Sequence, residues 1–170
     1  YPNIRFLNQS IEKKEFYQIS SLARSTAVEI IIPFKSGSGV IVEKKGRLYT
    51  VLTAWHILED VDLNFPFKIR TADYIIHTVN RKSIKQIENL DMAIFTFETE
   101  KEYEIVNFSN VSILKKGDEL FSSGFSDSNF YFQRGQLIAN SNIKVRDGNQ
   151  LLYTSKVVSG MSGGGIFDSY

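Results

Sequence analysis

The chain contains no cysteine and only two histidines among its 170 residues. Without cysteine, no disulfide can stabilise the fold, and this absence favours a reducing compartment such as the cytoplasm without fixing the location. Protein zinc sites are built mainly from cysteine and histidine, so this composition argues against one. We expect neither a metal ion nor any other cofactor.

Charge and hydropathy argue against two further classes of protein. The 20 basic and 19 acidic residues give a net charge of +1, which is neither the basic footprint of a nucleic-acid-binding protein nor an acidic disordered tail. No apolar run approaches the roughly 20 residues of a membrane-spanning helix, and no basic-then-apolar leader is present. Neither a nucleic acid nor a membrane is expected as a partner.

The apolar residues, 42% of the chain, can form the core of one domain or of two small barrels that share an interface. From residue 26 onward, short apolar segments alternate with turn residues, a pattern typical of antiparallel barrels and sandwiches. Strands are predicted at residues 27–34, 40–43, 48–54, 67–71, 74–80, 83–87 and 92–97. After a charged connection at 98–104, strands are predicted at residues 119–125, 129–138 and 150–154, with a hairpin turn at 147–149.

Residues 10–23 precede these strands and predict a short helix, with Ser10 as its N-cap. One face carries Ile11, Ile19 and Leu22, interrupted by the polar Glu15. An irregular arm ordered only by its contacts is the alternative. We expect the helix to pack against the first barrel. The predicted organisation is therefore an N-terminal arm at residues 1–24, a first β-barrel at 25–103 and a second at 104–170.

A glycine-rich segment near the end of the chain surrounds Ser162. Residues 158–167 read Val-Ser-Gly-Met-Ser-Gly-Gly-Gly-Ile-Phe. Glycines on both sides of the serine permit backbone angles closed to other residues, and they let successive N–H groups point into one concavity. Acyl transfer needs such donors beside a nucleophilic oxygen. The alternative is a glycine-rich hairpin whose serine only caps the turn.

A base and an acid occur upstream at positions that fit this chemistry. His56 follows the apolar run at residues 48–52, where a strand gives way to a loop or a short helical turn. Asp91 stands at the head of the apolar segment 92–95. Taken singly, His56 could be a core histidine and Asp91 a turn residue, but the order His, Asp, Ser is the order of the chymotrypsin triad. The second histidine, His77, is predicted to be a surface strand residue.

These segments resemble the trypsin-like serine proteases of the chymotrypsin fold, in their compact bacterial form. Residues 53–56 (Thr-Ala-Trp-His) match the family's Thr-Ala-x-His segment, and residues 91–94 (Asp-Met-Ala-Ile) match its Asp-hydrophobic-Ala-hydrophobic segment. Residues 160–164 (Gly-Met-Ser-Gly-Gly) match Gly-x-Ser-Gly-Gly. Softer matches are residues 37–42 and 117–125, so the resemblance covers roughly residues 25 to 170.

The resemblance implies an all-β fold of two antiparallel six-stranded barrels, with the active site in the cleft between them. It implies Ser162 as nucleophile, His56 as general base and Asp91 as the residue that orients the imidazole. The backbone N–H groups of Gly160 and Ser162 would form the oxyanion hole. The floor of the primary specificity pocket would lie near residues 155–157, that is Ser155, Lys156 and Val157. The substrate would be a polypeptide.

Two departures from the family pattern limit what carries over. Met161 stands where animal digestive members have an aspartate that receives a newly cut N-terminus, so that activation switch is absent. The family also continues for some tens of residues beyond the serine, whereas this sequence ends at Tyr170. We therefore expect a truncated second barrel, and a sequence that is a piece of a longer protein.

Three functional hypotheses follow. The first is a working serine endopeptidase, the protease domain of a larger bacterial protein. The second is a catalytically idle module that keeps the fold and binds peptides. The third is an effector protease that other modules of the same protein hold inactive, as in a sensor or defence assembly.

Overall fold

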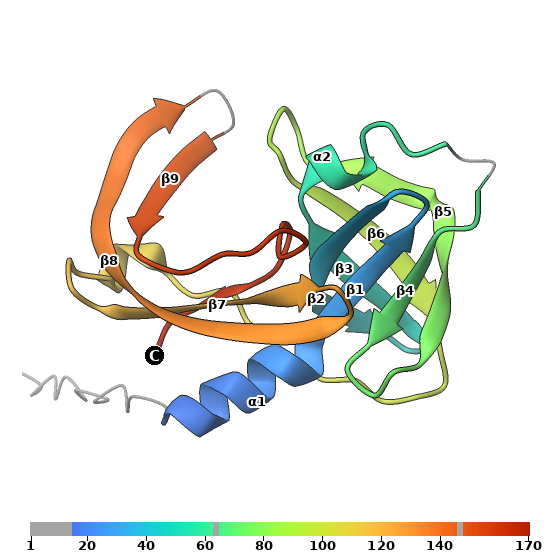
Figure 1. Ribbon diagram of the computed structural model, residues 1–170, viewed down its shortest axis with the longest axis horizontal. Helices are drawn as coiled ribbons and strands as arrows, with labels where there is room; N and C mark the ends of the chain where they lie inside the picture. The colour runs from blue at the N-terminus through green and yellow to red at the C-terminus, as the bar shows by residue number, and fades with distance from the viewer. Residues whose placement is uncertain (1–14, 63–64, 146–147) are drawn as a thin grey trace, which may run out of the picture.

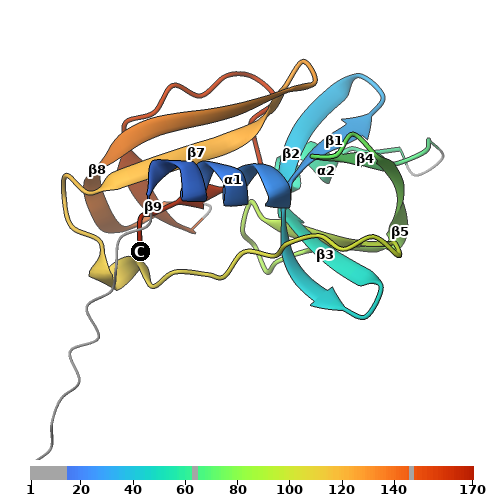
Figure 2. The ribbon, with the colours of Figure 1, turned by 90° about the horizontal axis from the view of Figure 1, so that it is seen from below.

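The computed structural model describes residues 15–62, 65–145 and 148–170, and it consists mainly of antiparallel strands arranged in two units (Figure 1). One helix runs beside them, and the two units meet along β2 and β7 (Figure 2). Within the described ranges, no helix combines the length and the apolar composition needed to cross a membrane.

The first unit is a closed barrel of six strands in the order β1-β2-β3-β6-β5-β4. Alternating apolar residues point into it, and its centre holds the buried rings of Tyr49, Phe67, Phe95 and Phe97. The one-turn helix α2 (Trp55–Leu58) follows the third strand. The strands are β1 (Ala27–Ile32), β2 (Lys35–Lys45), β3 (Leu48–Thr53), β4 (Lys68–Thr71), β5 (Ile76–Gln86) and β6 (Ala93–Glu98).

The second unit is an open sheet of four strands in the order β10-β7-β8-β9, reached through the short 3₁₀ helix η1 (Val111–Ile113). Its strands are β7 (Glu119–Ser126), β8 (Asn129–Val145), β9 (Gly148–Tyr153) and β10 (Ile166–Phe167). A small cluster of Leu114, Leu120 and Leu137 forms its core. The predicted fold class is confirmed, because one six-stranded barrel is closed and the second unit is an incomplete barrel.

The N-terminal helix α1 (Phe16–Thr26) begins after Glu15, whose backbone N–H donates to Gln18 Oε1 at 3.0 Å. The predicted cap at Ser10 lies outside the described residues. The helix contacts the first barrel through β2, as expected, and it also packs on the second unit through β8. Its Phe16 ring meets Phe121 and Phe132 at centroid distances of 5.6 and 5.4 Å, and Figure 2 shows α1 lying across β7 and β8.

Several strands are longer than predicted or have other bounds; β2 begins at Lys35 and not at residue 40, and β8 continues to Val145 and not to residue 138. The strands predicted at 74–80 and 83–87 are replaced by one strand, β5 (Ile76–Gln86), with a bulge between Asn80 and Lys85. The hairpin predicted at 147–149 shifts, since Gly148 and Asn149 already pair with Val145 and Lys144. Asp147 lies outside the described residues.

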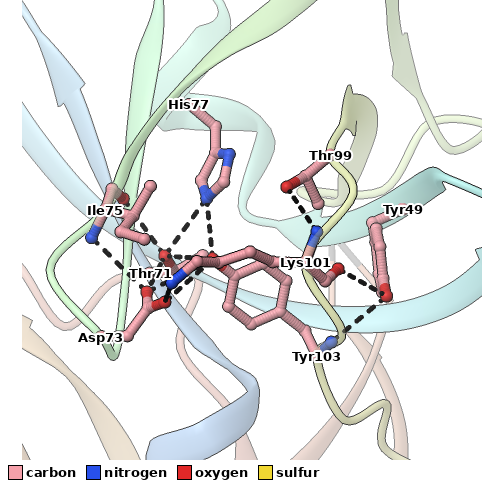
Figure 3. Close-up of polar contacts among 8 residues, drawn as sticks. All are labelled: Tyr49, Thr71, Asp73, Ile75, His77, Thr99, Lys101 and Tyr103. Atoms are coloured by element: carbon pink, nitrogen blue, oxygen red, sulfur yellow. Dashed lines mark hydrogen bonds and ion pairs between the residues drawn. The ribbon is translucent and has the colours of Figure 1, made fainter.

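His77 is buried inside the first barrel, with only 8% of its surface exposed, so its predicted surface position is wrong. Its Nε2 lies 2.9 Å from the Tyr103 hydroxyl, which also contacts Thr71 and Asp73 (Figure 3). Lys101 Nζ lies 3.1 Å from Asp73 Oδ2. This network fastens the connection between the two units to the barrel wall.

The network predicts a pH dependence of stability. Burial lowers the pKa of His77 in the folded protein, whereas an unfolded histidine titrates at about 6.5. Below about pH 6.5 the unfolded chain therefore binds more protons at this position, and the free energy of unfolding should fall with falling pH. Urea unfolding at pH 7 and pH 5 should show a smaller decrease for His77→Gln than for wild type. Equal decreases would mean that His77 does not carry the effect.

Candidate active site

His56 and Asp91 are brought together by the pairing of the strands beside them. In the β3–β6 ladder Thr53 stands opposite Ala93, so the end of one strand faces the beginning of the other. His56 lies in α2 just beyond Thr53, and Asp91 lies in the turn just before Ala93. The proximity of His56 and Asp91 thus follows from an ordinary antiparallel register between β3 and β6.

Two contacts fix the orientation of the His56 ring. Asp91 Oδ2 lies 2.7 Å from His56 Nδ1, and Asp91 Oδ1 accepts the His56 backbone N–H at 2.8 Å. An ionised carboxylate can only accept, so the hydrogen of the neutral ring is assigned to Nδ1 and the lone pair to Nε2. With 53% of the His56 side chain exposed, Nε2 can act as a base toward a bound molecule.

Ser162 lies in the turn between β9 and β10, and this turn packs on the segment that leads into His56. Ser162 C=O accepts the backbone N–H of Ser38 at 2.8 Å. A Cβ placed on Gly163 would lie 2.8 Å from Ala54 N, two residues before His56. Between Ser162 Oγ and His56 there is no hydrogen bond among the described residues; in ligand-free sites such bonds are commonly long.

The turn also carries the two backbone donors predicted for an oxyanion. Gly160 has φ +96° and Gly163 has φ +80°, angles that favour glycine on either side of Ser162. Within the described part of the chain, the N–H groups of Gly160 and Ser162 donate no hydrogen bond. The turn therefore holds two N–H groups that no described residue accepts from, as an oxyanion hole would require.

A cavity of about 330 Å³ opens beside Ser162. Of the three residues predicted for the specificity pocket, Val157 lines it, whereas Ser155 and Lys156 do not. Ser155 contributes indirectly, because its Oγ lies 2.5 Å from that of Ser122, which does line the cavity. Ser122 and Ser123 on β7, Tyr153 on β9 and Ile166 on β10 also line the cavity and were not predicted, because the pairing of distant strands brings them together.

The described residues contain no group of three or more His, Cys, Asp or Glu side chains that could hold a metal ion. The candidate chemical groups of this region are the side chains of Ser162, His56 and Asp91 and the backbone donors of the turn.

Replacing Gly163 by alanine should destabilise the protein strongly. Its positive φ costs a non-glycine residue about 1–3 kcal/mol. The added Cβ would also lie 2.3 Å from Ser38 O and from Thr53 Oγ1, and such overpacking typically costs about 1–3 kcal/mol more. The free energy of unfolding, measured with urea, reports the sum.

Gly117→Ala is the matched control for this substitution. Gly117 also has a positive φ, of +92°, but a Cβ there would meet nothing within 4 Å. Gly117→Ala should therefore lower the free energy of unfolding by the backbone cost alone. Equal losses in the two variants would contradict the close packing described for Gly163.

Comparisons with known proteins show the family and the fold of the chain. The model of a family described as trypsin-like peptidase domain matches residues 37–170. Among solved structures, one titled "Crystal structure of Deg5" superposes with a TM-score of 0.75 at 20% sequence identity, covering 91% of this chain and 79% of that one. At this identity the similarity shows the fold. No curated protein matches the chain.

Proposed function

Because the chain belongs to the trypsin-like peptidase domain family, we propose that it is a serine endopeptidase whose catalytic triad is Ser162, His56 and Asp91. The observation that carries the proposal is the His56–Asp91 pair. The two short contacts between His56 and Asp91 direct Nε2 away from the carboxylate. The Ser162 turn packs against the segment that leads into His56.

In the proposed reaction, Ser162 Oγ attacks the carbonyl carbon of a peptide bond while His56 Nε2 takes the hydroxyl proton. The C–N bond then breaks as His56 gives this proton to the leaving amine, and an acyl-enzyme remains. Water attacks the ester with His56 again as the base, and the carboxylic acid product leaves. Asp91 stabilises the imidazolium during both halves of the reaction.

The Gly160 and Ser162 N–H groups would hold the oxyanion that forms in each half. Both lie in the turn that carries the nucleophile, and neither donates to another described residue. In serine proteases a single such donor lowers the barrier by about 2.7–4 kcal/mol.

The proposed substrate is an extended polypeptide segment that adds to a sheet edge as a strand. We place the side chain preceding the cut bond in the cavity beside Ser162, where Val157, Tyr153 and Ile166 contribute to the wall. The segment of Ser155 and Lys156 borders this site without lining it.

Labelling with a fluorophosphonate probe tests the proposal. The probe should modify wild type and fail to modify Ser162→Ala, because only an activated serine attacks it. Absence of labelling in wild type would instead favour a peptide-binding module without activity. Labelling that appears only after a trigger is added would favour a protease held inactive by other modules.

A further inference from the structure

Ser38 links the two units of the fold directly behind the proposed nucleophile. It lies in β2 and is fully buried. Its backbone N–H donates to Ser162 C=O at 2.8 Å, and its own C=O accepts from Thr53 Oγ1 at 2.7 Å. One residue of the barrel thus contacts both the Ser162 turn and the strand that leads to His56.

The Ser38 hydroxyl also both accepts and donates a hydrogen bond. Its Oγ accepts the Phe125 N–H from β7 at 2.7 Å and donates to Gly160 C=O at 2.9 Å. Phe125 C=O, at 3.5 Å from Oγ, is too distant to compete for the single hydroxyl hydrogen. The hydroxyl therefore joins β2, β7 and the Ser162 turn in one buried contact.

These bonds hold the turn on both sides of its reactive part. The Gly160 and Ser162 carbonyls flank the Met161–Ser162 peptide group, and both are held by Ser38. Anchoring both carbonyls to one rigid strand restricts the rotation of that peptide group, whose N–H is one of the two proposed oxyanion donors.

The surroundings of the hydroxyl leave no substitute for it. Phe125 and Gly160 are buried residues, and the groups that Ser38 Oγ pairs are the Phe125 N–H and the Gly160 C=O. A Cβ on Gly124 would come within 2.8 Å of Ser38 Oγ and 2.9 Å of Met161 Cα. Losing the hydroxyl would leave the Phe125 N–H and the Gly160 C=O unpaired in a tightly packed interface.

We propose that Ser38 is a positioning residue for catalysis, which sets the place of Ser162 and of its oxyanion donors through the Gly160 and Ser162 carbonyls. This inference rests on the proposed peptidase function. Ser38 touches no reacting atom, and its effect is transmitted through the turn.

The test is Ser38→Ala in the intact protein, assayed with a fluorogenic peptide substrate. Since small displacements of reacting groups can cost about 100-fold in rate, kcat should fall by about 10- to 100-fold with little change in KM. Ser126→Ala is the matched control, because Ser126 is a buried serine next to Phe125 whose hydroxyl makes no hydrogen bond within the described residues. A kcat for Ser38→Ala equal to that of Ser126→Ala, or a loss confined to KM, would overturn the proposal.

Hydrogen exchange separates this inference from the proposed function. In Ser38→Ala, amides of residues 158–165 should exchange faster than in wild type even if the protein hydrolyses nothing. Unchanged exchange there would overturn the positioning role of Ser38. If Ser38→Ala does not fold, wild type decides alone. If the amides of Ser38 and Phe125 exchange as slowly as those of β3 and β6, the result supports the positioning role of Ser38. If they exchange as fast as the amides of exposed loops, the result overturns it.

Discussion

Ser162→Ala should lower kcat by on the order of 10⁶-fold, the loss that follows removal of the nucleophile in a serine protease. The backbone donors of the turn cannot replace the nucleophile, since they only stabilise charge. KM should change little, because Ser162 is exposed at the edge of the cavity and supplies no large contact surface. Hydrolysis of a fluorogenic peptide measures both constants.

His56→Ala should cost about as much, and the double variant hardly more, because nucleophile and base act as one unit. Ser159→Ala is the matched control, since Ser159 is an exposed serine in the same turn and no hydrogen bond of its hydroxyl occurs within the described part of the chain. Additive losses in the double variant would show that Ser162 and His56 act independently, which is incompatible with the triad.

The arrangement of His56 and Asp91 could be predicted from the sequence because local signals sufficed. Each residue adjoins a strand with a strong apolar pattern, and those strands, β3 and β6, are direct neighbours in the barrel. The ladder that pairs Thr53 with Ala93 then places His56 and Asp91 next to each other.

The position of His77 could not be predicted in the same way. The polar-apolar alternation of its strand indicated a surface position, but Ile75 and Ile76 are adjacent and lie on opposite faces, so they do not fix which face points inward. In the structure Ile76 is 56% exposed, whereas His77 faces inward against the Phe97 ring at a centroid distance of 4.9 Å. The hydroxyl of Tyr103, far along the chain, makes this burial tolerable by pairing with Nε2.

Ser38 and the cavity illustrate a second limit. A serine between two glycines is typical of a turn, and nothing local indicates that its hydroxyl reaches Phe125 and Gly160 in the other unit. The lining of the cavity likewise depends on how β7 and β10 pair, through Ile166 opposite Ser122. Such contacts depend on packing between distant segments, which local periodicity does not encode.

Asp91→Asn should lower kcat by about 10⁴-fold, the loss measured for the equivalent change in chymotrypsin-type enzymes. The asparagine oxygen can still accept the His56 backbone N–H, which Asp91 Oδ1 accepts at 2.8 Å. The amide NH₂ then faces Nδ1 in place of Oδ2 and can only donate to it. The ring hydrogen is driven to Nε2, which can no longer take the Ser162 proton.

The stability of the protein should change far less than its rate, because asparagine has the shape of aspartate and the site is partly open, with 39% of the Asp91 side chain exposed. Asp60→Asn controls for charge, since it removes one exposed carboxylate just beyond α2, where Asp60 lies 3.8 Å from Lys35 Nζ. Fluorophosphonate labelling should slow in parallel with hydrolysis. If Asp91→Asn kept a tenth of the wild-type kcat while Asp60→Asn kept all of it, the tautomer of His56 would have to be fixed by a group other than Asp91.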